Sequence, residues 1–76
     1  MKRRRIIMKK DKQIPLSVLR KSRGLTQKEF SDELGVSSSL IALYETGKRK
    51  PKLERAIEIG KFFNVPVENI SFTAEK

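Results

Sequence analysis

LTQKEFSDELGVSSSLIALYETG, residues 25–47, is the stretch that decides how this chain folds. Its apolar spacing predicts two short helices, which begin near Thr26 and Ser37 and are joined by a tight turn at Gly35. Thr26 is followed three residues later by a glutamate, a pattern typical of a capping box at a helix start. Two amphipathic helices closed by so short a turn would hold the second helix at the surface of the domain.

Further helices are predicted on both sides of this stretch. One spans residues 15–23 and ends at Gly24, another spans residues 52–63 and ends at Asn64, and a last helical turn covers residues 67–70. The residues expected in the core are Leu16, Val18 and Leu19, then Phe30 and Leu34, then Leu40, Ile41 and Tyr44, then Leu53, Ala56, Ile57, Gly60 and Phe63, and finally Val65, Val67 and Ile70.

Composition limits what this small domain can be. The 76 residues suffice for one domain and include no cysteine and no histidine, so we predict no disulfide, no metal site and no cofactor. No apolar run approaches the roughly 20 residues that a membrane-spanning helix needs. Catalysis is not expected either, because the chain has no Gly-rich phosphate loop and no clustered carboxylates. We also predict no small-molecule ligand.

Positive charge is the first indication of a partner. The formal net charge is +9, and residues 1–12 alone carry +6. We expect residues 1–13 to form a basic arm, which is a solvated terminus, a short strand at residues 5–8 paired with residues 70–73, or a segment lying along DNA. A basic protein of this size favours a polyanion such as nucleic acid. Binding to a membrane surface is not expected, because the arm lacks an aromatic or long apolar face.

The sequence of residues 14–72 resembles that of the phage repressor and Cro (XRE-type) helix-turn-helix family. The resemblance is carried by Leu19-Arg20, Gly24-Leu25-Thr26-Gln27, Leu34-Gly35-Val36-Ser37, Ile41, Tyr44-Glu45-x-Gly47-Lys48, Pro51 and Asn64-Val65. It implies an all-α fold, a compact five-helix bundle of the lambda-repressor-like type. Residues 73–76 lie outside the resemblance, and we expect them to form a C-terminal tail. The resemblance further implies a dimeric, cytoplasmic regulator of transcription, encoded by a prokaryote or phage, that binds double-stranded DNA.

The resemblance also assigns roles to single positions. Arg20 and Glu45 match a pair that forms a largely buried salt bridge and positions the third helix. Gln27 matches a residue that contacts a phosphate and braces the helix that contacts the bases. The other positions expected at phosphates or in the minor groove are Thr26, Thr46, Lys48, Lys50 and Lys52.

The base-facing positions depart from what many relatives carry. By family register they are Ser37, Ser38, Ser39, Ala42 and Leu43. None has the long polar side chain that makes paired hydrogen bonds to guanine or adenine, although Ala42 and Leu43 can contact thymine methyl groups. Ser37 is expected to cap its helix as well. Sequence preference would then depend on DNA shape, on the arm or on Lys52.

Two hypotheses remain open for the partner. In the first, the chain is a sequence-specific dimeric repressor. Phe62 motivates the dimer, because it neighbours Phe63 and both are not expected to fit inside one small monomer. The predicted dimer contacts are Leu53, Phe62, Val67 and Phe72. In the second, the chain is a protein-binding helix-turn-helix module, such as an antitoxin, with the apolar Leu43 facing its partner.

Overall fold

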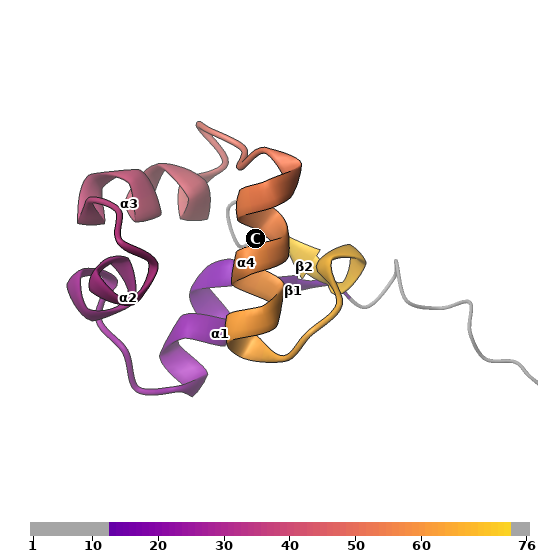
Figure 1. Cartoon of the computed structure of the whole chain (residues 1–76), viewed down its shortest axis with the longest axis horizontal. Coiled ribbons are helices and arrows are strands. Elements are labelled where there is room, and N and C mark those ends of the chain that lie inside the picture. Colours follow the sequence, from indigo (N-terminus) through magenta and orange to yellow (C-terminus); the bar gives the residue numbers. More distant parts are fainter. Residues whose placement is uncertain (1–12, 74–76) are drawn as a thin grey trace, which may run out of the picture.

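The computed structural model describes residues 13–73 of the chain (Figure 1). Gln13 is therefore the one residue of the predicted basic arm that can be described, and the predicted strand at residues 5–8 lies outside the described part. Residues 74–76 of the predicted tail also lie outside it. The elements, in order, are β1 (Ile14–Pro15), α1 (Leu16–Ser22), α2 (Gln27–Leu34), α3 (Ser38–Thr46), α4 (Leu53–Phe63), a 3₁₀ turn (Val67–Asn69) and β2 (Ile70–Ser71).

The four α-helices confirm the predicted ones to within about a residue at each end. Their ends follow from residues that adopt the left-handed conformation, in which a helix cannot continue. Gly35 ends α2 with φ 74°, and Gly47 ends α3 with φ 78°. Asn64 ends α4 with φ 59°, and it is the one non-glycine residue of the described part with a positive φ. Asparagine tolerates this conformation better than most residues.

The C-terminal part of the domain differs from the five-helix bundle that the resemblance implies. In place of a fifth α-helix, residues 67–69 form a single 3₁₀ turn. The helix does not extend further because Ile70 becomes extended, with φ −110° and ψ 131°, and pairs in parallel with Ile14. The expectation of a purely α-helical fold is thus wrong in one respect, because the domain also contains a pair of two-residue strands. This pair joins the two ends of the domain.

The core lies where the four helices meet. Three phenylalanine rings pack together there, with 5.1 Å between the ring centroids of Phe30 and Phe63 and 5.4 Å between those of Phe30 and Phe62. The buried residues of this core cluster are Leu16, Leu19, Phe30, Ile41, Tyr44, Ile59, Phe63 and Ile70.

The buried face of α4 is rotated by part of a helical turn from the predicted one. Leu53 is 70% exposed and Ile57 is 39% exposed, whereas Ile59, which was not predicted, is fully buried. The buried stripe consists of Ala56, Ile59, Gly60 and Phe63. Gly60 is a point of close approach, as predicted, because a Cβ there would lie 2.7 Å from the carbonyl oxygen of Val65. In α1, Val18 is 37% exposed and is likewise not a core residue.

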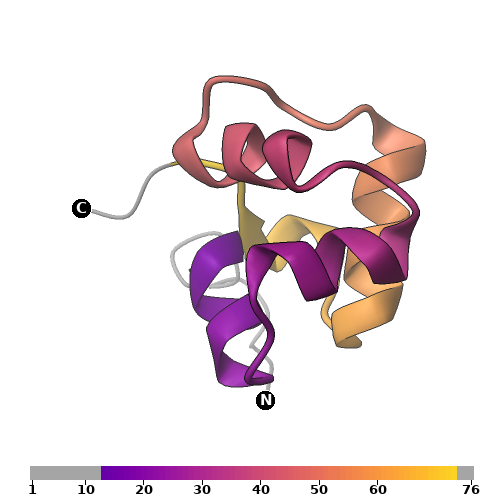
Figure 2. The same ribbon diagram turned by 90° about the vertical axis from the view of Figure 1, so that its left-hand side faces the viewer.

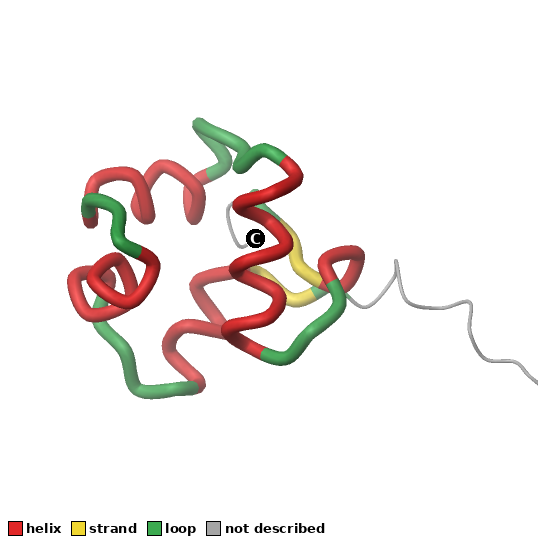
Figure 3. The backbone as a smooth tube through the Cα atoms, viewed as in Figure 1, coloured by secondary structure: helices red, strands yellow, loops and turns green. Residues whose placement is uncertain are grey.

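The arrangement of the helices leaves α3 at an edge of the domain. In two views at right angles, α3 and the loop from α3 to α4 occupy the same side of the molecule, and α1 lies on the other side (Figures 1 and 2). The tube drawing shows the same loop bending over the end of α3 before α4 begins (Figure 3). One face of α3 is therefore packed against the domain, and the opposite face is free of other elements.

Candidate nucleic-acid interface

The starts of α2 and α3 are fixed by side-chain hydrogen bonds. The Thr26 hydroxyl accepts a hydrogen bond from the backbone N–H of Glu29 at 3.0 Å, and the Glu29 carboxylate accepts one from the N–H of Thr26 at 2.9 Å. This is the predicted capping box. The Ser37 hydroxyl caps α3 by accepting from the N–H of Leu40 at 3.1 Å. The starts of both helices are therefore locally determined.

The inner face of α3 is anchored to the rest of the domain by a buried ion pair. Arg20 Nε donates to one carboxylate oxygen of Glu45 at 2.6 Å, and Arg20 Nη2 donates to the other at 3.2 Å. The side chains of this pair are only 10% and 6% exposed. Arg20 Nη1 also donates to the backbone carbonyl of Leu25 at 2.8 Å. The predicted salt bridge is present, and it joins α1, the start of α2 and α3.

Gln27 extends this network to the protein surface. Its Nε2 donates to the Glu45 carboxylate at 3.0 Å, and the residue is half-buried. The first residue of α2 thus holds the penultimate residue of α3. The second Nε2 hydrogen and the amide oxygen of Gln27 make no hydrogen bond within the described residues. Gln27 can therefore brace α3 and still offer a donor to an outside acceptor.

The outer face of α3 is built from small and apolar side chains. Ser39 and Thr46 are exposed, while Ser38, Ala42 and Leu43 are half-buried. The Thr46 hydroxyl donates to the backbone carbonyl of Leu43 at 3.2 Å. Neither Ser38 nor Ser39 uses its hydroxyl in a hydrogen bond within residues 13–73. This face is shallow and is open to a partner along the length of the helix.

The loop after α3 folds back onto the end of that helix. The backbone N–H groups of Lys48 and Arg49 both donate to the carbonyl oxygen of Leu43, at 3.1 and 3.3 Å. Residues 48–50 and Lys52 are exposed, and all four are basic. Positive charge is therefore concentrated next to the free face of α3, as expected for a surface that contacts a polyanion.

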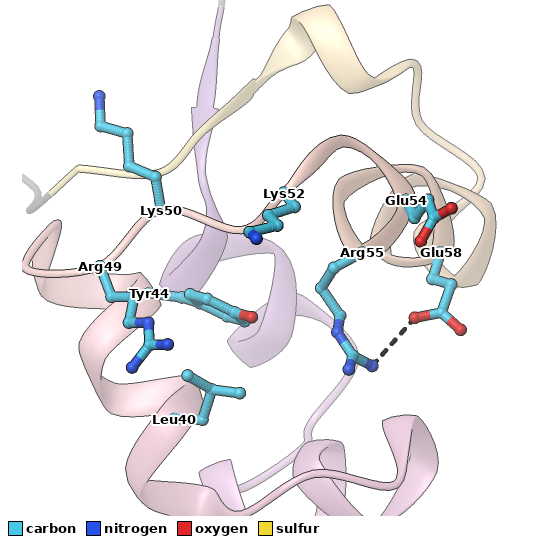
Figure 4. Close-up of a pocket in the computed structure, with 8 residues that line it drawn as sticks. All are labelled: Leu40, Tyr44, Arg49, Lys50, Lys52, Glu54, Arg55 and Glu58. Atoms are coloured by element: carbon cyan, nitrogen blue, oxygen red, sulfur yellow. Dashed lines mark hydrogen bonds and ion pairs between the residues drawn. The ribbon is translucent and has the colours of Figure 1, made fainter.

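A hollow of about 490 Å³ lies between this loop, α3 and the start of α4 (Figure 4). Its floor includes Leu40 and Tyr44 of α3, and four basic residues contribute to its walls. Arg55 is paired with Glu58 at 3.0 Å, so one of these charges is already compensated. The full lining is Leu40, Tyr44, Arg49, Lys50, Lys52, Glu54, Arg55 and Glu58.

Comparison with known proteins assigns this arrangement to a family. A family model described as Helix-turn-helix matches residues 16–70. The chain belongs to the helix-turn-helix family. It is 42% identical over 55 residues to an uncharacterised HTH-type transcriptional regulator of Methanocaldococcus jannaschii, covering 72% of this chain and 83% of that protein. No solved structure gives a significant match.

Two other relatives are named for opposite roles in transcription. The chain is 35% identical over 57 residues to the cryptic phage CTXphi transcriptional repressor RstR of Vibrio cholerae, covering 75% of this chain and 51% of that protein. It is 36% identical over 55 residues to the HTH-type transcriptional activator BcrR of Enterococcus faecalis, covering 72% of this chain and 27% of that protein. The chain thus spans about half and about a quarter of these two relatives.

Family membership confirms the predicted resemblance. This helix-turn-helix protein is a DNA-binding regulator of transcription and not an enzyme. Among residues 13–73, no helix has the length and apolar character needed to span a bilayer. The individual DNA-contacting residues predicted from the family remain predictions, although the structure gathers those of α3 and of the following loop on one side of the domain.

The residues predicted for a dimer interface separate into two groups in this helix-turn-helix domain. Leu53 is exposed at the start of α4, and Val67 is half-buried beside Gly60. Phe62 and Phe72 are instead partly buried against the core. Phe62 and Phe63 pack edge to face within one monomer with ring centroids 5.0 Å apart, but only Phe63 is fully buried. Phe62 fits because it lies over Phe30 at the margin of the core.

Arg49 and Arg55 were not predicted as site residues. The basic run at residues 48–52 was visible in the sequence, but the family register selected its lysines and passed over Arg49. Arg55 lies inside α4, where a basic residue looks like ordinary helix surface. Its position in the hollow depends on the angle at which α4 leaves the loop, which no local pattern encodes.

Proposed function

We propose that this helix-turn-helix protein is a sequence-specific, dimeric repressor that binds a near-palindromic operator with the helix Ser37–Thr46 in the major groove. The observation that supports this most is the contrast between the two faces of α3. Its inner face is fixed by the buried Arg20–Glu45 pair, and its outer face is open beside a basic loop. A helix held in this way can enter a major groove without reorganising.

The proposal divides the surface into two kinds of contact. Residues at the start and outer face of α3 face base edges, and serine hydroxyls together with apolar contacts to thymine methyl groups give modest discrimination. The residues proposed at base edges are Ser37, Ser38, Ser39, Ala42 and Leu43. Residues around them hold the phosphate backbone and set the register of the protein on the duplex. The residues proposed there are Thr26, Gln27, Thr46, Lys48, Lys50 and Lys52.

Salt dependence of binding to random duplex DNA tests the phosphate contacts. Each neutralised phosphate should contribute a slope of about −0.9 to log K against log salt concentration. We expect Lys48→Ala to weaken binding to all duplexes and to flatten this slope by about one unit. Lys21→Ala is the matched control, because it removes the same charge from α1 on the other side of the domain. Equal effects of the two variants would contradict the proposed contact surface.

A dimer is proposed through the exposed apolar side of α4. Leu53 and Ile57 lie one helical turn apart, and a shallow hollow of about 320 Å³ continues from Ile57 past Gly60 to Val67. Two copies joined here would present two α3 helices to half-sites about one helical turn of DNA apart. Multi-angle light scattering of the protein with a selected operator should show two chains per duplex. Leu53→Asp should leave the monomer folded and reduce this to one chain.

Repression rather than activation is the proposed outcome, and the similarity to RstR supports it. A reporter whose promoter overlaps the selected operator should lose expression when the protein is produced. Increased expression would instead favour activation, the role for which BcrR is named. We propose a cytoplasmic location, since the operator must be reached on chromosomal or phage DNA.

The second candidate function is a protein-binding module. It is favoured by the apolar Leu43 on the free face of α3, which a partner protein could cover as well as DNA. Binding to duplex DNA at low salt distinguishes the repressor from the protein-binding module. Absence of binding to any duplex at low ionic strength would reject the repressor, because a surface with several phosphate contacts binds random DNA under these conditions.

A further inference from the structure

The outer face of α3 lacks any side chain that can distinguish guanine strongly. Its predicted base-facing residues are serines, an alanine and a leucine. Paired hydrogen bonds to the O6 and N7 atoms of guanine require two donors in a fixed geometry, which arginine supplies best. If this helix-turn-helix domain recognises a guanine, the donor must come from a residue near α3 but outside it.

Arg49 is the candidate, because its guanidinium is not used within the domain. The structure describes four arginines, and three of them bind protein groups. Arg20 binds Glu45, and Arg55 binds Glu58. Arg23 donates to the carbonyl oxygen of Phe63 at 2.7 Å. Arg49 is exposed, and its guanidinium makes no hydrogen bond or ion pair among residues 13–73.

The position of Arg49 directs its side chain toward α3. Its backbone N–H donates to the carbonyl oxygen of Leu43, which holds the backbone of Arg49 at the C-terminal end of α3. The close-up shows the side chain running back along α3 toward Leu40, while the side chain of Lys50 points away (Figure 4). Arg49 therefore places a planar pair of donors alongside α3 near Leu40, in the hollow between the loop, α3 and the start of α4.

The acidic residues of the same hollow do not neutralise Arg49. Glu58 is paired with Arg55 at 3.0 Å. Glu54 lies in the first turn of α4, and in the close-up its carboxylate lies on the far side of the hollow from Arg49 (Figure 4). The guanidinium thus retains its charge and its donors for a partner.

We propose that Arg49 determines sequence specificity by donating two hydrogen bonds to the O6 and N7 atoms of a guanine in the major groove of each half-site. This inference rests on the proposed function. It adds a specificity contact from the loop to an α3 face that by itself offers only serine and apolar contacts. The alternative is that the Arg49 guanidinium donates to a backbone phosphate, a contact that carries no sequence information.

Selection of bound sequences from a random duplex pool tests the inference. The wild-type protein should select one guanine at symmetric positions of the two half-sites. Arg49→Ala should lose the preference at this position alone and bind the wild-type site more weakly by about 10- to 100-fold for each half-site. Lys50→Ala is the matched control from the same loop, and it should weaken all sequences evenly while selecting the same site. Arg49 is exposed, so circular dichroism should show both variants folded.

A second measurement identifies the atom that is contacted. Replacing the selected guanine by 7-deazaguanine removes N7 from the major groove and leaves the minor groove unchanged. Wild-type protein should bind this duplex more weakly, whereas Arg49→Ala should not distinguish it from the normal site. The same measurement remains informative on wild-type protein alone, whatever the behaviour of the variants.

Two results would overturn the inference while leaving the proposed function intact. In the first, Arg49→Ala selects the same guanine as wild type and merely binds all duplexes more weakly, so Arg49 contacts a phosphate. In the second, 7-deazaguanine has no effect on wild-type binding, so the contact is not at N7. Failure of the wild-type protein to bind any duplex at low salt would instead reject the proposed function itself.

Discussion

The two faces of α3 differ in how their polar groups are satisfied. On the inner face, Glu45 accepts hydrogen bonds from Arg20 and Gln27, and almost nothing of the ion pair is exposed. On the outer face, the hydroxyls of Ser38 and Ser39 make no hydrogen bond within residues 13–73. The inner face thus fixes the position of α3 in the domain, and the outer face is the one available to contact a partner. Substitutions on the inner face should therefore change stability, and those on the outer face should change the choice of DNA sequence.

Glu45→Ala should have the largest effect. It leaves the Arg20 guanidinium buried without its carboxylate partner, and an uncompensated buried charge costs about 3–5 kcal/mol. Urea unfolding followed by circular dichroism measures the loss. The double variant Arg20→Met, Glu45→Leu is the control, because replacing a buried pair by apolar residues is often close to neutral. A loss below about 1 kcal/mol for Glu45→Ala would show that the pair is not the anchor of α3.

The starts of α2 and α3 and the turn between them could be predicted from the sequence. The capping box at Thr26, the turn at Gly35 and the cap at Ser37 are local features, so each is determined by a few neighbouring residues. The resemblance then assigned Arg20 and Glu45 to each other across 25 positions. The ion pair is present in the structure, but its prediction rested on the family resemblance and not on a local pattern.

The face of α4 could not be predicted in the same way. Apolar residues occur at positions 53, 56, 57, 59, 62 and 63, and they fit two overlapping helical stripes equally well. Which stripe is buried depends on the angle at which α4 crosses the other helices. In the structure, Ile59 is fully buried and Ile57 is 39% exposed. The pairing of Ile14 with Ile70 is too short to leave a sequence pattern.

Gln27→Ala should have the next largest effect on the inner face. It removes one donor to the Glu45 carboxylate while the bonds from Arg20 remain, so we expect a loss of about 1.5 kcal/mol, at the lower end of the range for a hydrogen bond to a charged group. Thermal unfolding can measure this difference. Gln27→Glu sharpens the test, because it keeps the shape of the side chain but places a second carboxylate beside Glu45. If Gln27→Glu is as stable as wild type, the contact with Glu45 does not form in solution.

Thr26→Ala should cost about 1 kcal/mol, a typical value for loss of a helix cap. The N–H of Glu29 would lose its acceptor, but it lies at the exposed start of α2 and can bind water instead. Thr26→Ser keeps the hydroxyl and should retain most of the stability. Differential scanning calorimetry of both variants gives the comparison. Equal losses for alanine and serine would mean that the methyl group of Thr26, and not the cap, contributes the stability.

Ser39→Ala should have the smallest effect on stability, within about 0.5 kcal/mol, because Ser39 is exposed and its hydroxyl binds no other described group. Under the proposed function, it should nevertheless change the bases selected from a random duplex pool, while affinity for random DNA stays nearly constant. Leu43→Ala should also act on selection, with a larger cost in stability because Leu43 is half-buried. If Leu43→Ala unfolds the domain, Leu43 belongs to the inner face and the division of α3 proposed above is wrong. If both variants fold and select the wild-type sequence, base preference must come from residues outside α3. The loop residue Arg49 is then the first candidate for the specificity contact.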